Sequence, residues 1–576
     1  MAKPIQLQDA YKTYTYDQDK IVSPEETIQR VRERLAHLDM EILKETVRID
    51  TGRLDIPIYI SRCGVDAVKI VGTQKQMGKG GTPFQSEASA LMELVERFSF
   101  FSFIEEQPFI WASQKELGDQ TIPFDWLSRC FYDTSPVIPK VKEIFETAPL
   151  AWAWATHIRE GKAVLLPIHW FYLIHEYNGP AAGNSMEEAI LQSLCEVVER
   201  HVSSIISHEK IITPNILPDS VKDPIARELM HKFERLGIPL YIKDFSLDTG
   251  IPTVGTLAYD PSTFPEKSEI VFTAGTTPSP EKSLIRAITE IAQLAGDFIN
   301  RTTYRPTLPK FKDLKEASYI TEGGNRVSIE SLPNLTSVNF KEEVYSAVEA
   351  LTKRELEVLV VDVTHPQIGI PAVYTLIPGA HFRDRTRHTD TCFHLAKLLS
   401  QYPDPQRAAY ELRRMEKAFP ERYEVQFFLG YAKERSGHPE EALDHLQKAL
   451  AMGPKTIDIS SILCHIGVAY KDMEEYGKAI EFLEQAREYN RDQKEIYNQL
   501  GYCYYKIKEH AKAIEQFERA IEIDPGSAID YANIGSNLRE MGHVKEAMQL
   551  YRMALELDPS IEFARANLEK LTQNTL

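Results

Sequence analysis

The feature that most constrains the fold of this sequence is a repeat with a 34-residue period in its last third. Small residues recur in three columns, at intervals of 37, 34 and 34 residues. The columns are Gly430, Gly467, Gly501 and Gly535; Ala442, Ala479, Ala513 and Ala547; and Ala449, Ala486, Ala520 and Ala554. A period of this length indicates stacked copies of one supersecondary unit.

Each unit has the pattern of two antiparallel helices. Apolar residues recur at i, i+3, i+4 and i+7, and the small columns fall where the two helices approach closely. Proline ends three of the four units, at Pro454, Pro525 and Pro559. One unit cannot bury its apolar face alone, so the units must stack. A generic helical bundle is the plainer alternative, but it does not require three columns in one register.

The pattern resembles a tetratricopeptide-repeat (TPR) array of about four repeats over residues 426–576. Residues 389–425 are expected to form a helical linker or a degenerate first repeat, which leaves residues 1–388 as a separate domain. Such arrays usually present a concave groove to a peptide or a partner protein, an expectation that rests on the fold alone.

Composition excludes several classes of protein. A chain of 576 residues is too long for one hydrophobic core, and its 43% apolar and 26% charged residues are ordinary for a globular protein. The net charge of -18 disfavours a nucleic-acid surface, which needs excess Lys and Arg. An acidic protein can still bind ATP if Mg²⁺ mediates the contact.

The same sequence predicts a cytoplasmic protein. Its six cysteines include no Cys-x-x-Cys pair, so neither a zinc site nor a disulfide framework is expected. The polar N-terminus lacks the apolar core of a signal peptide. The sequence contains no run of about 18 apolar residues, which is the length needed to cross a membrane. No membrane association is therefore expected.

Before the repeats, the sequence reads as mixed α and β, with strand-like runs at residues 56–61, 357–363 and 371–377. Three predicted helices each carry polar residues on one face. The polar sets are Ser89, Glu93 and Glu96 in residues 78–101; Asn184, Glu188, Glu196 and Glu199 in residues 181–201; and Arg286, Glu290 and Gln293 in residues 283–298. Ala, Leu, Ile and Val fill much of the remaining surface of each helix.

Glutamates at helical spacing usually form a solvated face, and for one helix that interpretation is the better one. Three helices of the same construction favour an internal site instead, and two of them end in Glu-x-x-Glu-Arg, at residues 93–97 and 196–200. Carboxylates that converge in a site shielded from water repel one another, and this repulsion is costly unless cations neutralise their charge. Mg²⁺ takes oxygen ligands and leaves part of its shell for substrate phosphates, so the pattern indicates a Mg²⁺–nucleotide site.

A glycine-rich turn precedes the first of these helices. Gly78, Lys79, Gly80 and Gly81 combine close backbone approach with a positive charge, and Ser86 follows nearby. The turn is not a Walker A motif, because the order GxxxxGK[ST] is absent.

These segments resemble the signature motifs of the YcaO family. The family pattern is Ser-x-x-x-Glu-x-x-Glu, then Asn-x-x-x-Glu-Ala followed by Glu-x-x-Glu-Arg, then Arg-x-x-x-Glu-x-x-Gln. The resemblance covers roughly residues 20 to 385 and implies an α/β (mixed α+β) ATP-binding fold distinct from P-loop proteins. It also implies ATP- and Mg²⁺-dependent phosphorylation of a peptide-backbone amide oxygen, after which a nucleophile attacks the carbon and phosphate leaves.

The resemblance also implies roles for individual residues. The expected Mg²⁺ ligands are Glu93, Glu96, Glu188, Glu196 and Glu199. The expected nucleotide-binding residues are Lys79, Ser86, Ser89, Asn184, Arg200, Arg286, Glu290 and Gln293. No protein nucleophile is expected, because phosphoryl transfer needs positioning and charge neutralisation more than covalent chemistry. A basic segment at 381–388 is a second candidate, for which a solvated loop is the plainer interpretation.

Three hypotheses for the function stay open. The leading one is thioamide formation, because the chain lacks the Pro-rich tail of azoline-forming members and its opening resembles stand-alone members that pair with TfuA proteins. An azoline-forming cyclodehydratase is the alternative within the enzyme class. A TPR scaffold with a regulatory or degenerate nucleotide site is the alternative of another class. Expected partners are a peptide or protein substrate, a TfuA-like or other sulfur-delivery protein, a protein ligand in the TPR groove and a second copy of the chain in a homodimer.

Overall fold

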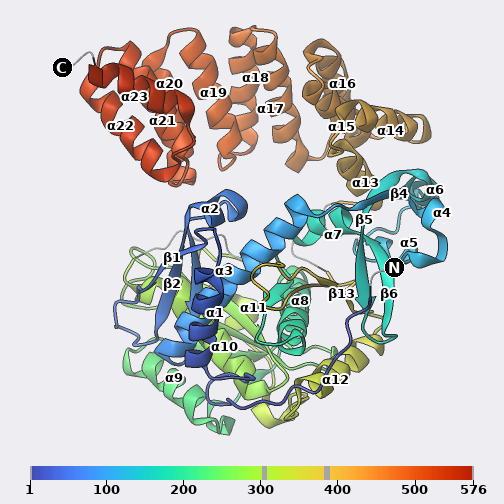
Figure 1. Cartoon of the computed structure of the whole chain (residues 1–576), viewed down its shortest axis with the longest axis vertical. Helices are drawn as coiled ribbons and strands as arrows, with labels where there is room; N and C mark the ends of the chain where they lie inside the picture. The colour runs from blue at the N-terminus through green and yellow to red at the C-terminus, as the bar shows by residue number, and fades with distance from the viewer. Residues whose placement is uncertain (1–2, 301–307, 382–388, 574–576) are drawn as a thin grey trace. The chain divides into compact units, whose positions relative to one another are not determined.

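The computed structural model describes residues 3–300, 308–381 and 389–573, and the chain divides into two compact units between Thr391 and Cys392 (Figure 1). Each unit is described by itself. Apart from His381, the basic segment at 381–388 lies outside the described residues.

The described residues of the first unit form three sheets that are almost entirely antiparallel. A three-stranded sheet has the order β1 (Leu43–Arg48), β2 (Ile58–Cys63), β3 (Lys75–Lys79). A five-stranded sheet has the order β11 (Val271–Thr276), β10 (Thr253–Ala258), β9 (Leu240–Asp244), β8 (Asn215–Ile216), β12 (Arg326–Val327). A six-stranded sheet has the order β4 (Ile110–Ser113), β5 (Pro149–His157), β13 (Leu359–Asp362), β14 (Ala372–Leu376), β7 (Pro180–Ala182), with β6 (Lys162–Pro167) beside β5. The three predicted strand runs are confirmed as β2, β13 and β14.

The three predicted polar-faced helices are confirmed as α3 (Pro83–Glu106), α8 (Met186–Glu209) and α10 (Pro280–Ala295). Their first turns are capped by the side chains of Thr82, Ser185 and Ser279, each of which accepts a backbone N–H three residues on. The other helices of this unit are α1 (Pro24–Ala36), α2 (Val65–Val71), α4 (Gln114–Leu117), α5 (Phe124–Ser128), α6 (Ile138–Thr147), α7 (Ile168–His175), α9 (Pro224–Arg235), α11 (Ser318–Thr321) and α12 (Phe340–Thr352).

Each polar-faced helix packs its apolar side on its own set of elements, although α8 and α10 both contact β11. Helix α3 lies against β2, β3 and α1, helix α8 against β7, β14, β11 and α12, and helix α10 against β10 and β11. Leu91, Ile190 and Ile288 are fully buried in three separate hydrophobic clusters. Because each apolar side already has its own core, the polar faces of the helices are left to converge.

The second unit is a run of helices, which confirms the predicted α-helical array. They are α13 (Thr391–Ser400), α14 (Pro405–Ala418), α15 (Tyr423–Arg435), α16 (Pro439–Ala451), α17 (Thr456–Asp472), α18 (Tyr476–Tyr489), α19 (Lys494–Lys506), α20 (His510–Ile523), α21 (Ala528–Glu540), α22 (Val544–Leu557) and α23 (Glu562–Gln573). Contacts are densest within the pairs α15–α16, α17–α18, α19–α20 and α21–α22, and each pair also packs on the next.

The glycine column lies where the two helices of a pair meet, as the sequence predicts. A Cβ built on Gly467 would come within 2.6 Å of Leu483, and one on Gly501 within 2.7 Å of Phe517. The alanine columns are buried in the same seams. Small residues therefore set the separation of the paired helices.

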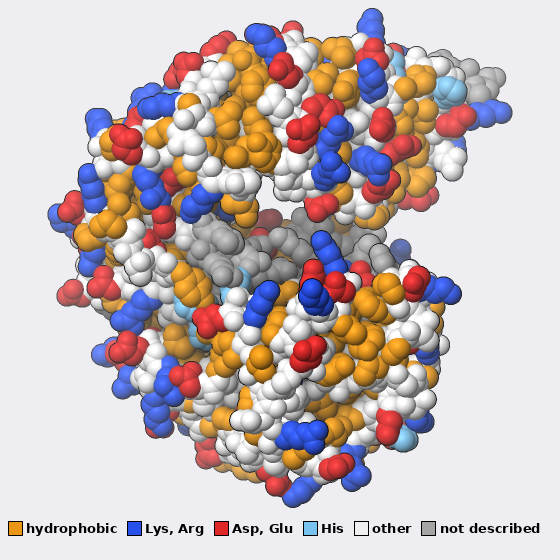
Figure 2. Space-filling model, turned by 180° about the vertical axis from the view of Figure 1, so that it is seen from behind, with side chains coloured by type: hydrophobic (Ala, Val, Ile, Leu, Met, Phe, Trp, Pro, Cys, Tyr) orange, Lys and Arg blue, Asp and Glu red, His pale blue; other side chains and the backbone are white. Residues whose placement is uncertain are grey.

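Charged side chains of both signs are interspersed over the face drawn in Figure 2. The net charge of -18 is therefore not displayed there as one continuous acidic field. Within the described part of the chain, no helix combines the length and apolar character needed to span a bilayer.

Gly467→Val is expected to destabilise the second unit by roughly 1–3 kcal/mol, because the added side chain overpacks the contact with Leu483. Gly477→Ala is the matched control, because it lies in α18 with no atom within 4 Å of a built Cβ. Thermal unfolding of the full chain, followed by circular dichroism, measures both. An unchanged helical transition in Gly467→Val would contradict the tight-packing account.

Candidate nucleotide site

A cavity of about 260 Å³ lies where helices α3, α8 and α10 converge beside the end of β3. Eleven of the thirteen predicted site residues line it, and the exceptions are Ser86 and Glu199. The eleven are Lys79, Ser89, Glu93, Glu96, Asn184, Glu188, Glu196, Arg200, Arg286, Glu290 and Gln293. Residues up to 214 positions apart in the sequence therefore share one pocket.

Basic side chains pair with the carboxylates across this pocket. Lys79, at the end of β3, donates to Glu290 on α10. On helix α3, the Arg97 guanidinium lies 3.3 Å from the carboxylate of the adjacent Glu96. It lies 3.7 Å from the carboxylate of Glu93, one turn earlier. The Arg97 guanidinium also lies over a tyrosine ring, with 4.9 Å between its central carbon and the ring centroid.

Glu199 lies behind the pocket lining and is fully buried. Its carboxylate accepts from Arg200 at 2.8 Å, lies 3.6 Å from Nε of Arg286 and accepts from the Thr276 backbone N–H at 3.2 Å. Glu199 thus lies one layer behind the lining residues, and its expected role as a Mg²⁺ ligand stays a prediction. Its contacts orient Arg200 and Arg286, both of which line the pocket.

Burial leaves part of this carboxylate charge poorly compensated. Burial raises the pKa of Glu93, Glu96 and Glu199, and for Glu96 it does so well above the ordinary value despite the nearby Arg97. Glu290 differs, because Lys79 and the two pocket arginines outweigh the effect of burial and lower its pKa. An added cation close to these carboxylates would offset part of the cost of burying their charge.

Among the lining residues that the structure describes, five carboxylates are balanced by five basic side chains. The carboxylates are Glu93, Glu96, Glu188, Glu196 and Glu290, and the basic residues are Lys20, Lys79, Arg97, Arg200 and Arg286. Among the described residues, no three His, Cys, Asp or Glu side chains are gathered closely enough to form a ready-made metal cluster. Mg²⁺ in nucleotide sites is commonly held by one or two carboxylates together with substrate phosphates, so this donor set fits Mg²⁺ that binds with a nucleotide.

Ser86 supports the fold and does not face the pocket. Its hydroxyl donates to the Gly78 carbonyl at 2.9 Å and accepts from the Tyr59 backbone N–H at 3.1 Å. A Cβ on Gly78 would come within 2.2 Å of the Ser86 carbonyl oxygen, so this glycine is required for strand β3 to approach helix α3. These contacts show a structural role for Ser86, and its expected phosphate contact stays a prediction.

Several lining residues were missed by the sequence reasoning. They are Gln18, Lys20, Thr27, Gln85, Arg97 and Gln192, together with smaller and apolar residues. The signal for Arg97 was present, because it ends the first Glu-x-x-Glu-Arg motif as Arg200 ends the second. No periodic signal marks Gln18 or Lys20, which approach the pocket from a segment outside the three helices.

Ser86→Ala is expected to lower the free energy of unfolding by about 1–3 kcal/mol, because it removes the acceptor of the part-buried Tyr59 N–H. The KM for ATP should stay within about twofold of the parent value if no phosphate contact is lost. Thermal unfolding and ATP-dependent kinetics separate the two effects. A normal unfolding midpoint together with a greatly raised KM for ATP would instead indicate that Ser86 contacts the nucleotide.

Comparison with known proteins places these observations in a family. A family model described as YcaO cyclodehydratase, ATP- and Mg²⁺-binding, matches residues 77–381. Models of the tetratricopeptide repeat match residues 395–456, 460–493, 495–527 and 531–561. The first of these spans includes residues 395–425 of the segment expected to form a linker or a degenerate repeat.

Three similar proteins illustrate the range of the match. An uncharacterized protein of Methanothermobacter thermautotrophicus is 26% identical over 62% of this chain and 94% of its own length. A protein of Rhizobium leguminosarum bv. trifolii, described as an uncharacterized protein in the tfuA 3' region, is 24% identical over 63% of this chain and 88% of its own length. A solved heterocyclase in complex with substrate and cofactor is 23% identical with a TM-score of 0.53, over 66% of this chain and 55% of that longer chain, and shows the shared fold.

Proposed function

Because this chain belongs to the YcaO family, we propose that its first unit is an enzyme that uses ATP and Mg²⁺ to activate a backbone amide of a peptide. The observation that carries the proposal is the convergence of the three polar helix faces on one pocket. That pocket is lined both by carboxylates, which can ligate a metal, and by Lys and Arg side chains. A solvated-face origin for these glutamates would have left them on separate surfaces.

The pocket residues divide by chemistry. ATP, held with Mg²⁺, supplies the phosphoryl group that turns the amide oxygen into a leaving group. Lys79, Arg200 and Arg286 offer positive charge to a polyanion, with Arg200 and Arg286 held in place by the buried Glu199. Glu93 and Glu96 offer carboxylate oxygens where burial disfavours uncompensated negative charge. Positioning and charge neutralisation are what phosphoryl transfer demands of a protein.

We favour a thioamide as the product, with an azoline as the second candidate. In both reactions the activated carbon loses its oxygen as phosphate. An external sulfur species then gives a thioamide, whereas a Cys, Ser or Thr side chain of the substrate gives a ring. All six cysteines of this chain are buried, so the sulfur for a thioamide would come from another molecule. A relative described by its place beside tfuA supports a TfuA-like protein as the partner.

The TPR array would recruit the peptide substrate or that partner. Its matches to repeat models cover nearly the whole second unit, and such arrays bind protein segments in a groove. The division of labour is therefore chemistry in the first unit and recruitment in the second.

Glu93→Gln is expected to lower ATP turnover by the full chain at least about tenfold, because it removes a carboxylate charge that the cation needs. Glu87→Gln is the matched control on the same helix, since Glu87 pairs with Arg32 at 2.8 Å and does not line the pocket. Turnover is measured with a peptide mixture present, and mass spectrometry of the peptides distinguishes loss of water from exchange of oxygen for sulfur.

Equal turnover in Glu93→Gln and the parent would refute the assignment of this carboxylate. A parent chain that fails to bind Mg²⁺–ATP in calorimetry would instead favour a scaffold whose nucleotide site is degenerate.

A further inference from the structure

A short hairpin at residues 13–21 lies at the edge of the nucleotide pocket. Lys20 N–H donates to the Tyr14 carbonyl at 2.8 Å, and Tyr14 N–H donates back at 3.1 Å. Gln18 and Lys20 from this hairpin line the pocket. The hairpin precedes residues 77–381, which the family model matches, so its role is not given by that match.

The tip of the hairpin holds the glycine-rich turn. Asp17 is fully buried, and its carboxylate accepts from the Gly81 backbone N–H at 2.8 Å and from the Tyr14 hydroxyl at 2.8 Å. Gly81 follows two pocket-lining residues, Lys79 and Gly80. The Gly81 backbone N–H, a candidate phosphate donor in the sequence, is therefore hydrogen-bonded to the hairpin through Asp17. This bond holds the glycine-rich turn in place.

The returning arm of the hairpin holds a predicted metal ligand. The Ile21 backbone N–H donates to one oxygen of Glu188 at 3.1 Å, and the Lys20 ammonium lies 3.3 Å from the other. Asn184 Nδ2 donates to that second oxygen at 3.3 Å. The Glu188 side chain is only 3% exposed, so its orientation is set by these partners and not by water.

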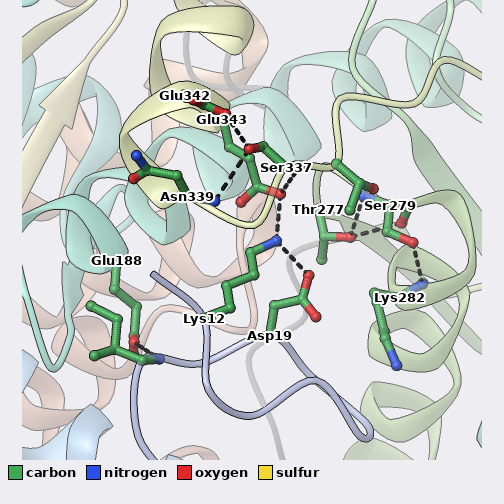
Figure 3. A network of polar contacts seen from close by, with 12 residues as sticks. Lys12, Asp19, Glu188, Thr277, Ser279, Lys282, Ser337, Asn339, Glu342 and Glu343 are labelled. Atoms are coloured by element: carbon green, nitrogen blue, oxygen red, sulfur yellow. Dashed lines mark hydrogen bonds and ion pairs between the residues drawn. The ribbon is translucent and has the colours of Figure 1, made fainter. Parts of the chain in front are cut away.

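Buried contacts fasten the hairpin to two further helices. Lys12 lies 2.7 Å from Asp19 and also pairs with Glu343 of helix α12 (Figure 3). The side chains of Lys12 and Glu343 are 4% and 0% exposed, and breaking a pair so deeply buried is strongly destabilising. On the other side, Lys282 of helix α10 donates to the Tyr16 carbonyl. The hairpin therefore has one defined position relative to α8, α10 and the glycine-rich turn.

We infer that this hairpin is a positioning element of the nucleotide site, in which Lys20 holds Glu188 and Asp17 holds the Lys79–Gly80 turn. The inference rests on the proposed Mg²⁺–ATP function of the pocket. Lys20 also adds one of the five positive charges that face the cavity. A hairpin with only a structural role would not need a partly exposed lysine at the pocket, and the Lys20 side chain is 22% exposed.

The test measures binding of a non-hydrolysable ATP analogue with Mg²⁺ to the full chain by calorimetry, alongside thermal unfolding without ligand. Lys20→Met should weaken binding about tenfold, the scale of one charge-assisted contact, with little change in the unfolding midpoint. Lys20→Arg should recover most of the affinity, because it keeps the charge. Lys69→Met is the matched control, since Lys69 is 70% exposed and pairs with Asp66 away from the pocket.

Two further variants decide between explanations. Asp17→Ala should raise the KM for ATP more than it lowers kcat, because it loosens the turn and leaves the reacting groups in place. Glu93→Gln tests the pocket itself. If Glu93→Gln loses binding while Lys20→Met stays within about twofold of the parent, the hairpin inference is wrong and the proposed function stands.

Other outcomes also overturn the inference. A large fall in the unfolding midpoint of Lys20→Met, without rescue by Lys20→Arg, would make the hairpin a stabilising element only. If both Lys20→Met and Glu93→Gln bind the analogue as the parent does, the pocket is not the nucleotide site and the inference fails with it.

Discussion

The burial of carboxylates at the meeting point of three helices is the constraint on which the first unit depends. Water would normally stabilise these charges, and its partial removal raises the pKa of Glu93, Glu96 and Glu199. The fold compensates with basic residues drawn from the same helices and from β3. Glu199 shows the arrangement most clearly, because one fully buried carboxylate contacts two arginines and a backbone N–H of β11. Each helix can present its polar face inward only because its apolar face has a separate core on a sheet.

This compensation changes the argument for a metal. Acidic helices alone indicate that a cation must come first, but the lining residues are formally balanced by five basic side chains. The metal is therefore not needed to hold the empty fold together. It is needed when a polyanion enters, because the Lys and Arg side chains are already paired with carboxylates and their charge is only partly available. The nucleotide alone would add several negative charges to this balanced pocket. When Mg²⁺ binds with it, the metal neutralises part of that charge.

Local patterns predicted much of this structure, and long-range contacts explain what they missed. Helical period and small-residue columns are local, so the repeat array and helices α3, α8 and α10 followed from the sequence. Spacing alone could not distinguish Glu196, which lines the pocket, from Glu199 behind it, because both lie on the inward side of one helix. The family resemblance assigns Ser86 to a phosphate contact, whereas the contact that the structure shows bridges the glycine-rich turn to β2. The hairpin contact between Lys20 and Glu188 joins residues 168 positions apart, and no periodic signal marks it.

The most direct test of the central claim is the Mg²⁺ dependence of nucleotide binding by the full chain. A non-hydrolysable ATP analogue is titrated by calorimetry once with excess Mg²⁺ and once with a chelator. The account predicts that affinity with Mg²⁺ exceeds affinity with the chelator by at least about tenfold, because the pocket cations are already paired. Equal affinity in the two conditions would show that the basic residues alone accept the nucleotide, and would contradict the proposed role of the buried carboxylates.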